Sequence, residues 1–271
     1  MKNFSVLFAL LLGAVLFLAA CGAEEEAAEP AEGGAEEENL LAAIEEEGVL
    51  RIGTEGTYPP FTFHDDSGEL TGFDVEIARE VAERLGVEAE FMETQWDAMF
   101  AGLNAERFDM IANQVGIRED RLEKYDFSDP YITSAAVLVT RADDTEITEF
   151  EDLEGKTTAQ SLTSNFAEIA KSYGAEIEGV EGFSQSVELL NSGRVDALVN
   201  DRIAVLDYLN QRPDAEIQIA AIHEDASQSG LMFRQGNEEL VEAVNEALAA
   251  MIEDGTYEEI STKWFGENVL E

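Results

Sequence analysis

Residues 103–113 of the chain read LNAERFDMIAN, and residues 190–200 read LNSGRVDALVN. Both stretches follow the pattern L-N-x-x-R-x-D-x-(I/L)-x-N, and both pass from a helix end into the apolar run of a strand. The copies lie 87 residues apart, which is too long for a solenoid repeat and suits two similar lobes. The pattern therefore predicts two α/β lobes. The alternative is a chance likeness between two helix–turn–strand junctions.

The chain around the first copy alternates between strand and helix signals. Residues 49–54, 87–92 and 109–114 have the composition of strands. Between them, apolar residues recur every four positions over 73–85, and a second helical face covers 96–103. This β-α-β-α-β order predicts a mostly parallel sheet with helices on its faces.

Three later segments are expected to connect the lobes. Residues 134–141 and 229–234 are β-rich runs that we expect to cross from one lobe to the other. Residues 238–265 have helical spacing and are expected to return to the first lobe.

The composition excludes two kinds of partner. The chain has 271 residues, 45% of them hydrophobic, and 59 acids against 16 bases give a formal net charge of −43. A nucleic-acid binder needs clustered Lys and Arg to displace counterions, so we expect no nucleic-acid partner. Electrostatic docking on an anionic membrane is disfavoured for the same reason.

The N-terminus has the pattern of an exported lipoprotein. Residues 1–20 combine an early lysine, an apolar run and small residues, which is typical of a signal peptide. Residues 18–21 read LAAC, which resembles the lipobox of bacterial lipoproteins and makes Cys21 the expected lipidation site. The alternative is an ordinary signal peptide with a chance cysteine. Residues 21–38, rich in Gly, Ala and Glu, are then an acidic disordered tether holding the protein at the outer face of the cell membrane, or in a periplasm.

Ligands bind at the carboxyl ends of strands in open parallel sheets. The loops expected there carry acids, one cation, amides and aromatic rings: Glu55, Tyr58, Trp96, Asn113, Gln114, Arg121, Ser161, Thr163, Ser164, Asn165 and Asp201. This mixture suits a zwitterion, because a guanidinium grips a carboxylate and an aspartate attracts an ammonium group. Plainer alternatives are surface ion pairs for Arg121 and Asp201, and core positions for Tyr58 and Trp96.

Signals of catalysis are weak. The chain has no H-E-x-x-H, Walker A or G-x-S-x-G pattern, and its two histidines lie far from any nucleophile motif. Acidic pairs are expected by chance in so acidic a chain. We expect no enzyme activity, no cofactor and no metal site.

Five motifs together carry a family resemblance. They are GTEGTYPPF at 53–61, LTGFDVE at 70–76, YDFSDPY at 125–131, DGTY at 254–257 and KWFG at 263–266. With them, residues 40–271 resemble the family 3 extracellular solute-binding proteins of polar amino-acid ABC importers. Four shorter stretches look like the L-cystine-binding branch: GTEGTY at 53–58, QWD at 95–97, NQV at 113–115 and SLTSN at 161–165.

The resemblance implies a two-lobed periplasmic-binding-protein fold of type II with two hinge strands. The first lobe would comprise 39–134 and 228–271, and the second 135–227. By motif position Arg121 would hold the ligand's α-carboxylate and Asp201 its α-ammonium group. The full set of implied ligand-binding residues is Glu55, Tyr58, Trp96, Asn113, Gln114, Val115, Gly116, Arg121, Ser161, Thr163, Ser164, Asn165, Phe166 and Asp201. One departure is Asn-Gln-Val-Gly at 113–116, where histidine and lysine binders tend to carry serines.

The function implied is capture of a polar amino acid, with L-cystine favoured, and its delivery to an ABC permease by a monomeric, lipid-anchored protein. Two rival functions are a sensor that presents the amino acid to a receptor kinase and an enzyme similar to cyclohexadienyl dehydratase.

Overall fold

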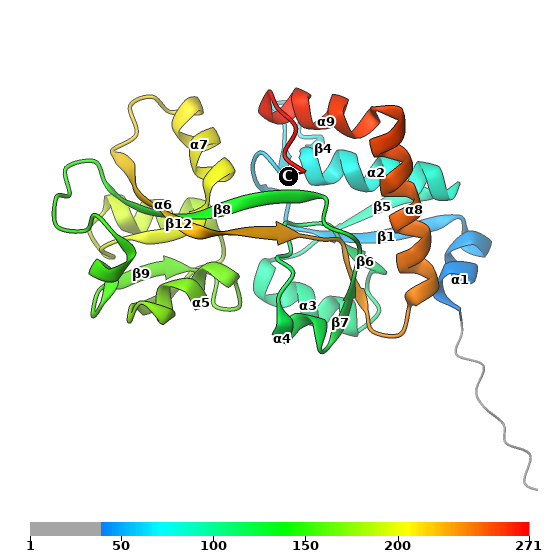
Figure 1. The fold of residues 1–271 in the computed structure, drawn as a ribbon, viewed down its shortest axis with the longest axis horizontal. Helices are drawn as coiled ribbons and strands as arrows, with labels where there is room; N and C mark the ends of the chain where they lie inside the picture. The colour runs from blue at the N-terminus through cyan, green and yellow to red at the C-terminus, as the bar shows by residue number, and fades with distance from the viewer. Residues whose placement is uncertain (1–38, 271) are drawn as a thin grey trace, which may run out of the picture. The chain divides into compact units, whose positions relative to one another are not determined.

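The computed structural model describes residues 39–270. The expected signal peptide, the lipidation site at Cys21 and the acidic tether lie outside these residues. No helix within residues 39–270 is both long enough and apolar enough to cross a membrane. The fold of these residues has two lobes, each built around its own β-structure (Figure 1).

The first lobe contains a five-stranded sheet in the order β5-β1-β6-β13-β7. Strand β1 (Val49–Thr54) runs parallel to β5 (Glu88–Glu93) and to β6 (Met110–Ile111). Strand β13 (Met232–Arg234) is antiparallel to both β6 and β7 (Tyr125–Phe127). Strand β7 therefore points in the same direction as β1, β5 and β6, and β13 alone runs against them. The prediction of a mostly parallel sheet is confirmed for four of the five strands, and β13 differs because it enters the sheet directly from a hinge strand.

Helices α1 (Leu40–Glu47), α2 (Phe73–Leu85), α3 (Trp96–Asn104), α4 (Glu119–Leu122), α8 (Glu238–Asp254) and α9 (Thr256–Phe265) belong to the same lobe. Helix α2 has the bounds that its apolar spacing predicts, and Gly86 ends it with a φ of 76°. The predicted helical run over 238–265 returns to this lobe, but Gly255 divides it with a φ of 87°. Strands β2 (Thr57–Tyr58), β3 (Thr62–His64) and β4 (Leu70–Thr71) form a small sheet that was not predicted from the sequence.

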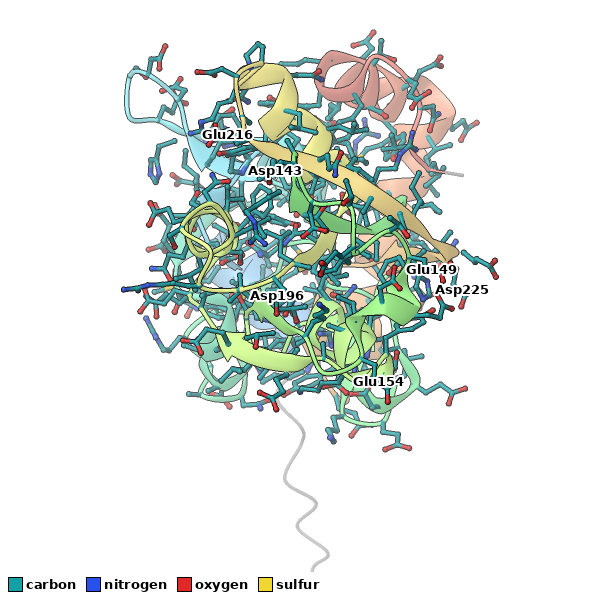
Figure 2. The ribbon with its side chains drawn as sticks, turned by 90° about the vertical axis from the view of Figure 1, so that its left-hand side faces the viewer. Asp143, Glu149, Glu154, Asp196, Glu216 and Asp225 are labelled. Carbon is teal, nitrogen blue, oxygen red and sulfur yellow. The ribbon has the colours of Figure 1, made fainter. Side chains whose placement is uncertain are left out.

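The second lobe is smaller. Parallel strands β9 (Thr157–Gln160) and β10 (Glu176–Gly179) lie beside a sheet in the order β11-β8-β12, in which β11 spans Leu198–Asp201. Its helices are η1 (Phe150–Leu153), α5 (Asn165–Ser172), α6 (Phe183–Asn191) and α7 (Arg202–Gln211). Figure 2 shows its outer end, where the labelled carboxylates are spread out: Asp143, Glu149, Glu154, Asp196, Glu216 and Asp225. All of these residues except the half-buried Asp196 are exposed, so much of the negative charge in this lobe is solvated.

Two long antiparallel strands connect the lobes (Figure 1). Strand β8 (Ile132–Arg141) fits the first predicted crossing, whereas β12 (Ile217–Ser229) ends where the second crossing was expected to begin. The expected segment 229–234 was misplaced because its apolar end is β13, which pairs inside the first lobe. The register of β8 and β12 shifts between Ile222 and Ala226, in the stretch that leads to the first lobe.

The repeated sequence pattern has the same structure in both lobes. In the first copy α3 leads into β6, and in the second α6 leads into β11. Asp109 exchanges backbone and side-chain hydrogen bonds with Arg51: its N–H donates to the Arg51 carbonyl at 2.8 Å, and its Oδ2 accepts from the Arg51 N–H at 3.0 Å. Asp196 makes the same two bonds with Thr157, both at 2.8 Å. The likeness of the two stretches is therefore structural.

A glycine in β1 and a glycine in α3 make room for one large core side chain. Phe108 is fully buried, and a Cβ added at Gly53 would lie 2.5 Å from its Cε2 atom. A Cβ added at Gly102 would lie 2.8 Å from the same ring. Close packing of this ring holds α3 against β1 and β6, next to the loops that form the site.

Candidate functional site: an inter-lobe cavity

A cavity lies between the lobes and is partly open to solvent, and its empty space, open solvent included, is about 540 Å³. The first lobe contributes Glu55, Thr57, Tyr58, Trp96, Asn113 and Gln114 to its wall. The second contributes Gln160, Ser161, Ser164, Asn165, Phe166, Gly182, Phe183, Ser186 and Asn200. The site is therefore assembled from strand ends and helix starts of both lobes.

Glu55 is fixed at the end of β1 by Asn113. The Asn113 Oδ1 atom accepts from the Glu55 N–H, and its Nδ2 atom donates to the Glu55 carboxylate, both at 2.7 Å. Burial raises the pKa of Glu55 to about 7, although the Asn113 amide opposes this shift. Glu55 is thus a carboxylate for which a nearby cation would favour the charged form.

Gln114 adopts an uncommon backbone conformation at the cavity wall. Its φ is 53°, and Asp74 holds it there by accepting from its backbone N–H at 2.8 Å and from its Nε2 at 2.6 Å. Asp74 is fully buried, and burial raises its pKa to about 7. Asp74, in the LTGFDVE motif, was not among the predicted site residues, yet it sets the position of one that was.

Tyr58 and Asn200 join the lobes across the cavity. The Tyr58 hydroxyl donates to Asn200 Oδ1 at 2.7 Å, and the same oxygen accepts from the Asp201 N–H at 2.9 Å. The Tyr58 ring also meets Phe183 edge-on, with ring centroids 6.4 Å apart. These two aromatic rings give the cavity an apolar wall between its polar ends.

Asp201 begins helix α7. Its Oδ1 accepts from the Ile203 N–H at 2.7 Å and from the Ala204 N–H at 3.3 Å, which makes it an N-cap. The side chain is buried, and burial raises its pKa to about 6. Asp201 makes no direct ion pair with Arg202 among the described residues, although the charge of Arg202 lowers the pKa of Asp201 against the larger effect of burial.

Arg121 is a buried cation with no carboxylate partner in the described part of the chain. Its Nη1 donates to the Gly116 carbonyl at 2.9 Å and its Nη2 to the Thr163 carbonyl at 3.1 Å. The guanidinium also lies 5.5 Å from the ring centroid of Trp96 and 5.3 Å from that of Phe100. Burial lowers its pKa to about 10. The surface ion pair considered for Arg121 belongs instead to its neighbour Arg118, which pairs with Asp120 at 2.9 Å.

A second inter-lobe contact lies at the start of α3. The Asp97 carboxylate accepts from the Thr163 N–H at 3.0 Å, from the Thr163 hydroxyl at 2.7 Å and from the Leu162 N–H at 3.3 Å. Because Arg121 binds the carbonyl of the same threonine, two first-lobe side chains hold Thr163. The lobes are therefore closed on one another.

The structure brings together nine of the fourteen predicted ligand-binding residues at the cavity wall: Glu55, Tyr58, Trp96, Asn113, Gln114, Ser161, Ser164, Asn165 and Phe166. The other five do not line it: Val115, Gly116, Arg121, Thr163 and Asp201. Val115 packs in the core with Trp96. Gly116 bridges to Ser229 of the hinge, and Arg121, Thr163 and Asp201 make the contacts given above.

Of the other six wall residues, Asn200 ends the repeated pattern at 190–200, and five were not singled out from the sequence: Thr57, Gln160, Gly182, Phe183 and Ser186. Gly182 and Phe183 follow the carboxyl end of β10 and start α6, so the strand-end rule applied to that strand would have found them. Within residues 39–270 no group of three or more His, Cys, Asp or Glu side chains is arranged to hold a metal ion.

Comparison with known proteins assigns the family. The family model of the bacterial extracellular solute-binding proteins, family 3, matches residues 50–267. The chain belongs to this family. Among family members, the L-cystine-binding protein TcyA of Bacillus subtilis (strain 168) is 49% identical over 266 residues, which cover 98% of each chain.

Two solved structures bear on the conformation. The L-cystine solute receptor of Neisseria gonorrhoeae, in its unliganded open conformation, is 46% identical, with a TM-score of 0.57 over 86% of this chain and 99% of that one. An ancestral arginine-binding protein bound to arginine is 38% identical, with a TM-score of 0.76 over 80% of this chain and 98% of that one. The less identical but ligand-bound structure superposes better, in agreement with the closed arrangement of the lobes.

Proposed function

We propose that this solute-binding protein captures a zwitterionic amino acid, L-cystine, between its lobes and presents it to the permease of an ABC importer. The observation that carries the proposal is a pair of buried, unpaired charges. Arg121 from the first lobe and Asp201 from the second have no oppositely charged partner among residues 39–270, and each lies beside a residue of the cavity wall.

A buried charge without a counter-charge is costly, because its lost hydration is not replaced. An α-amino acid carries one charge of each sign a few ångströms apart. A carboxylate entering between Arg121 and the start of α5 would accept from the guanidinium, and an ammonium group near Asp201 would favour its ionised form. The ligand would then stabilise the closed form, since it contacts both lobes.

The choice of L-cystine is supported by the relatives and by the cavity. One relative is named an L-cystine-binding protein and is 49% identical over nearly the full length of this chain. Tyr58 and Phe183 provide an aromatic wall on which a disulfide can pack, since sulfur makes favourable contacts with ring edges.

A thermal-shift screen of the twenty amino acids and L-cystine tests the ligand. Free ligand at 100 times its Kd stabilises a protein by about 2.7 kcal/mol. For a chain of this size such a gain raises Tm by roughly 5–10 °C. We expect that shift with L-cystine, and calorimetry should give one site per chain. A shift of that size with a different amino acid and none with L-cystine would contradict the ligand assignment.

Location and anchoring complete the proposal. Members of the family are extracellular, which agrees with the export signal expected at 1–20. We propose that lipid on Cys21 anchors a monomer to the membrane through the 21–38 tether. Mass spectrometry of the membrane fraction should show a diacylglyceryl mass on the Cys21 peptide, and Cys21→Ser should release the protein from the membrane.

Glu55 is a specific reason to test catalysis as the second candidate function. A cavity carboxyl with a pKa near 7 can exchange a proton at neutral pH, as an enzyme of the dehydratase type requires. We expect no turnover of prephenate or arogenate. Product formation that is lost in Glu55→Gln would establish the enzyme instead.

A further inference from the structure

The N-terminus of helix α6 lies at the cavity and has no capping side chain. Its N-cap is Gly182, which has no side chain to accept from the first N–H groups of the helix. In the same lobe Ser164 caps α5 and Asp201 caps α7 with their own side chains. Gly182 and Phe183 both line the cavity, so the exposed N–H groups at this helix start are within reach of a ligand.

An unpartnered donor lies beside this helix start. Gln160, at the end of β9, is only 2% exposed and lines the same cavity. Its Oε1 accepts from the Thr158 hydroxyl at 3.0 Å, which directs the amide, and its buried Nε2 has no hydrogen-bond partner. The Gln160 carbonyl accepts from the Val180 N–H at 3.2 Å, so the chain entering α6 is tied to this residue. A buried donor without an acceptor destabilises the empty protein, and a ligand acceptor can recover that cost.

The opposite wall carries a carboxylate. Glu55 and Thr57 share a second pocket with Gly182 and Phe183, so Glu55 and the start of α6 lie on the same passage. This passage offers helix N–H donors at α6 and a half-buried acid at Glu55, and the exposed Glu181 lies at its rim. An α-amino-acid head group, with its carboxylate toward α6 and its ammonium group toward Glu55, matches that distribution.

We propose that Gln160 and the N-terminus of α6 form a second carboxylate subsite, which makes the cavity selective for ligands with an amino-acid head at both ends. The inference rests on the proposed function and extends it. Arg121 takes the first head of the ligand, and α6 with Gln160 takes the carboxylate of the second. Selection for the second carboxylate distinguishes L-cystine from amino acids that have only one.

The test compares two ligands that differ in one carboxylate. L-cystine is compared by calorimetry with the mixed disulfide of cysteine and cysteamine, which keeps both ammonium groups and lacks the second carboxylate. We expect the wild-type protein to bind L-cystine at least about 10-fold more tightly, the equivalent of one charge-assisted hydrogen bond.

Gly182→Asp places a carboxylate where the ligand carboxylate would bind. A Cβ at Gly182 meets no atom within 4 Å, and aspartate is a favoured N-cap, so the Tm of the empty protein should stay the same or rise. We expect the affinity for L-cystine to fall at least about 30-fold, from like-charge repulsion and loss of the helix N–H groups, with a change of less than about threefold for the mixed disulfide. Gly182→Asn is the matched control, because it caps without charge and should weaken L-cystine binding less.

Gln160→Glu provides an independent variant of the same size. Its carboxylate can still accept from Thr158, but it repels a ligand carboxylate and attracts an ammonium group. We expect it to reverse the preference, so that the mixed disulfide binds better than L-cystine. Equal binding of the two ligands by the wild-type protein, or equal losses for both ligands in the variants, would overturn the subsite while leaving the proposed function intact. Failure of the wild-type protein to bind either ligand would overturn both.

Discussion

Replacement of Arg121 by methionine separates a ligand-binding role from a structural one. Methionine keeps the unbranched, apolar portion of the side chain that packs between Trp96 and Phe100, and it removes the guanidinium. In the empty protein the variant loses two hydrogen bonds to carbonyl groups, at 2.9 and 3.1 Å, and two cation–π contacts. It also loses a buried cation that has no counter-charge in the described structure.

These effects have opposite signs for folding. Hydrogen bonds from a charged group contribute about 1.5–3 kcal/mol each, and the desolvation of a buried ion costs several kcal/mol. We therefore expect the free energy of unfolding of the empty protein to change by no more than about 1 kcal/mol. In the complex the same substitution leaves a buried ligand carboxylate unpaired, which costs about 2–5 kcal/mol. That loss corresponds to a Kd about 30- to 4,000-fold higher.

The assay is calorimetry with L-cystine on Arg121→Met, with Tm of the empty protein measured in parallel. Arg118→Met is the matched control, since Arg118 is the neighbouring arginine, is partly exposed and pairs with Asp120, whereas Arg121 is buried against the cavity-wall residue Trp96. We expect its Kd to stay within about threefold of the wild-type value, as usual for a partly exposed ion pair. An unchanged Kd in Arg121→Met would refute the role of the guanidinium, and equal losses in both variants would point to a general field effect.

Three further predictions concern other contacts. Burial raises the pKa of Asp74 to about 7, so the folded state binds its proton more tightly than the unfolded state between about pH 4 and 7, and the free energy of unfolding should fall by up to about 4 kcal/mol as pH rises through this window. Burial acts in the same direction on Glu55 and Asp201, so Asp74→Asn should reduce the slope of urea-unfolding free energy against pH in this window without abolishing it, and an unchanged slope would contradict the assignment. Asp97→Ala removes the carboxylate that accepts hydrogen bonds from Thr163, so the empty protein should have a larger radius of gyration by small-angle scattering and should bind ligand about fivefold more weakly. An unchanged radius of gyration would show that this contact does not maintain closure. Gly53→Ala drives a Cβ into the Phe108 ring and should cost about 1–3 kcal/mol in thermal unfolding, with partial recovery in the double variant that also carries Phe108→Leu; no recovery would place the strain elsewhere.

The sequence predicted the fold best where local patterns are strong. The bounds of α2 followed from its apolar spacing and Gly86, and the paired motifs at 103–113 and 190–200 predicted two lobes. Strand direction was harder to predict, because a strand as short as β13 has too little sequence pattern to show that it pairs antiparallel with β6. The prediction also misplaced the second hinge strand, because a β-rich stretch of sequence does not show which other strand it pairs with.

The sequence predicted only those features of the candidate site that belong to a single loop. The strand-end rule brought Glu55 and Asn113 together, because each follows its own strand of one sheet. It missed Gln160, whose significance lies in an unpaired amide nitrogen, and Asp97, whose role depends on contact with the opposite lobe. An unpaired amide nitrogen and a contact with the opposite lobe are three-dimensional features that no local sequence pattern records.

The matched bonds of Asp109 and Asp196 have a consequence for how the protein moves. Asp109 ties the start of β6 to β1, and Asp196 ties the start of β11 to β9, so each half of the binding surface is held by contacts within its own lobe. Opening would then move the two lobes apart as rigid bodies about the hinge strands β8 and β12, and it would break only the contacts between the lobes. Ligand binding then orders few residues, so little of the binding free energy is lost to conformational entropy.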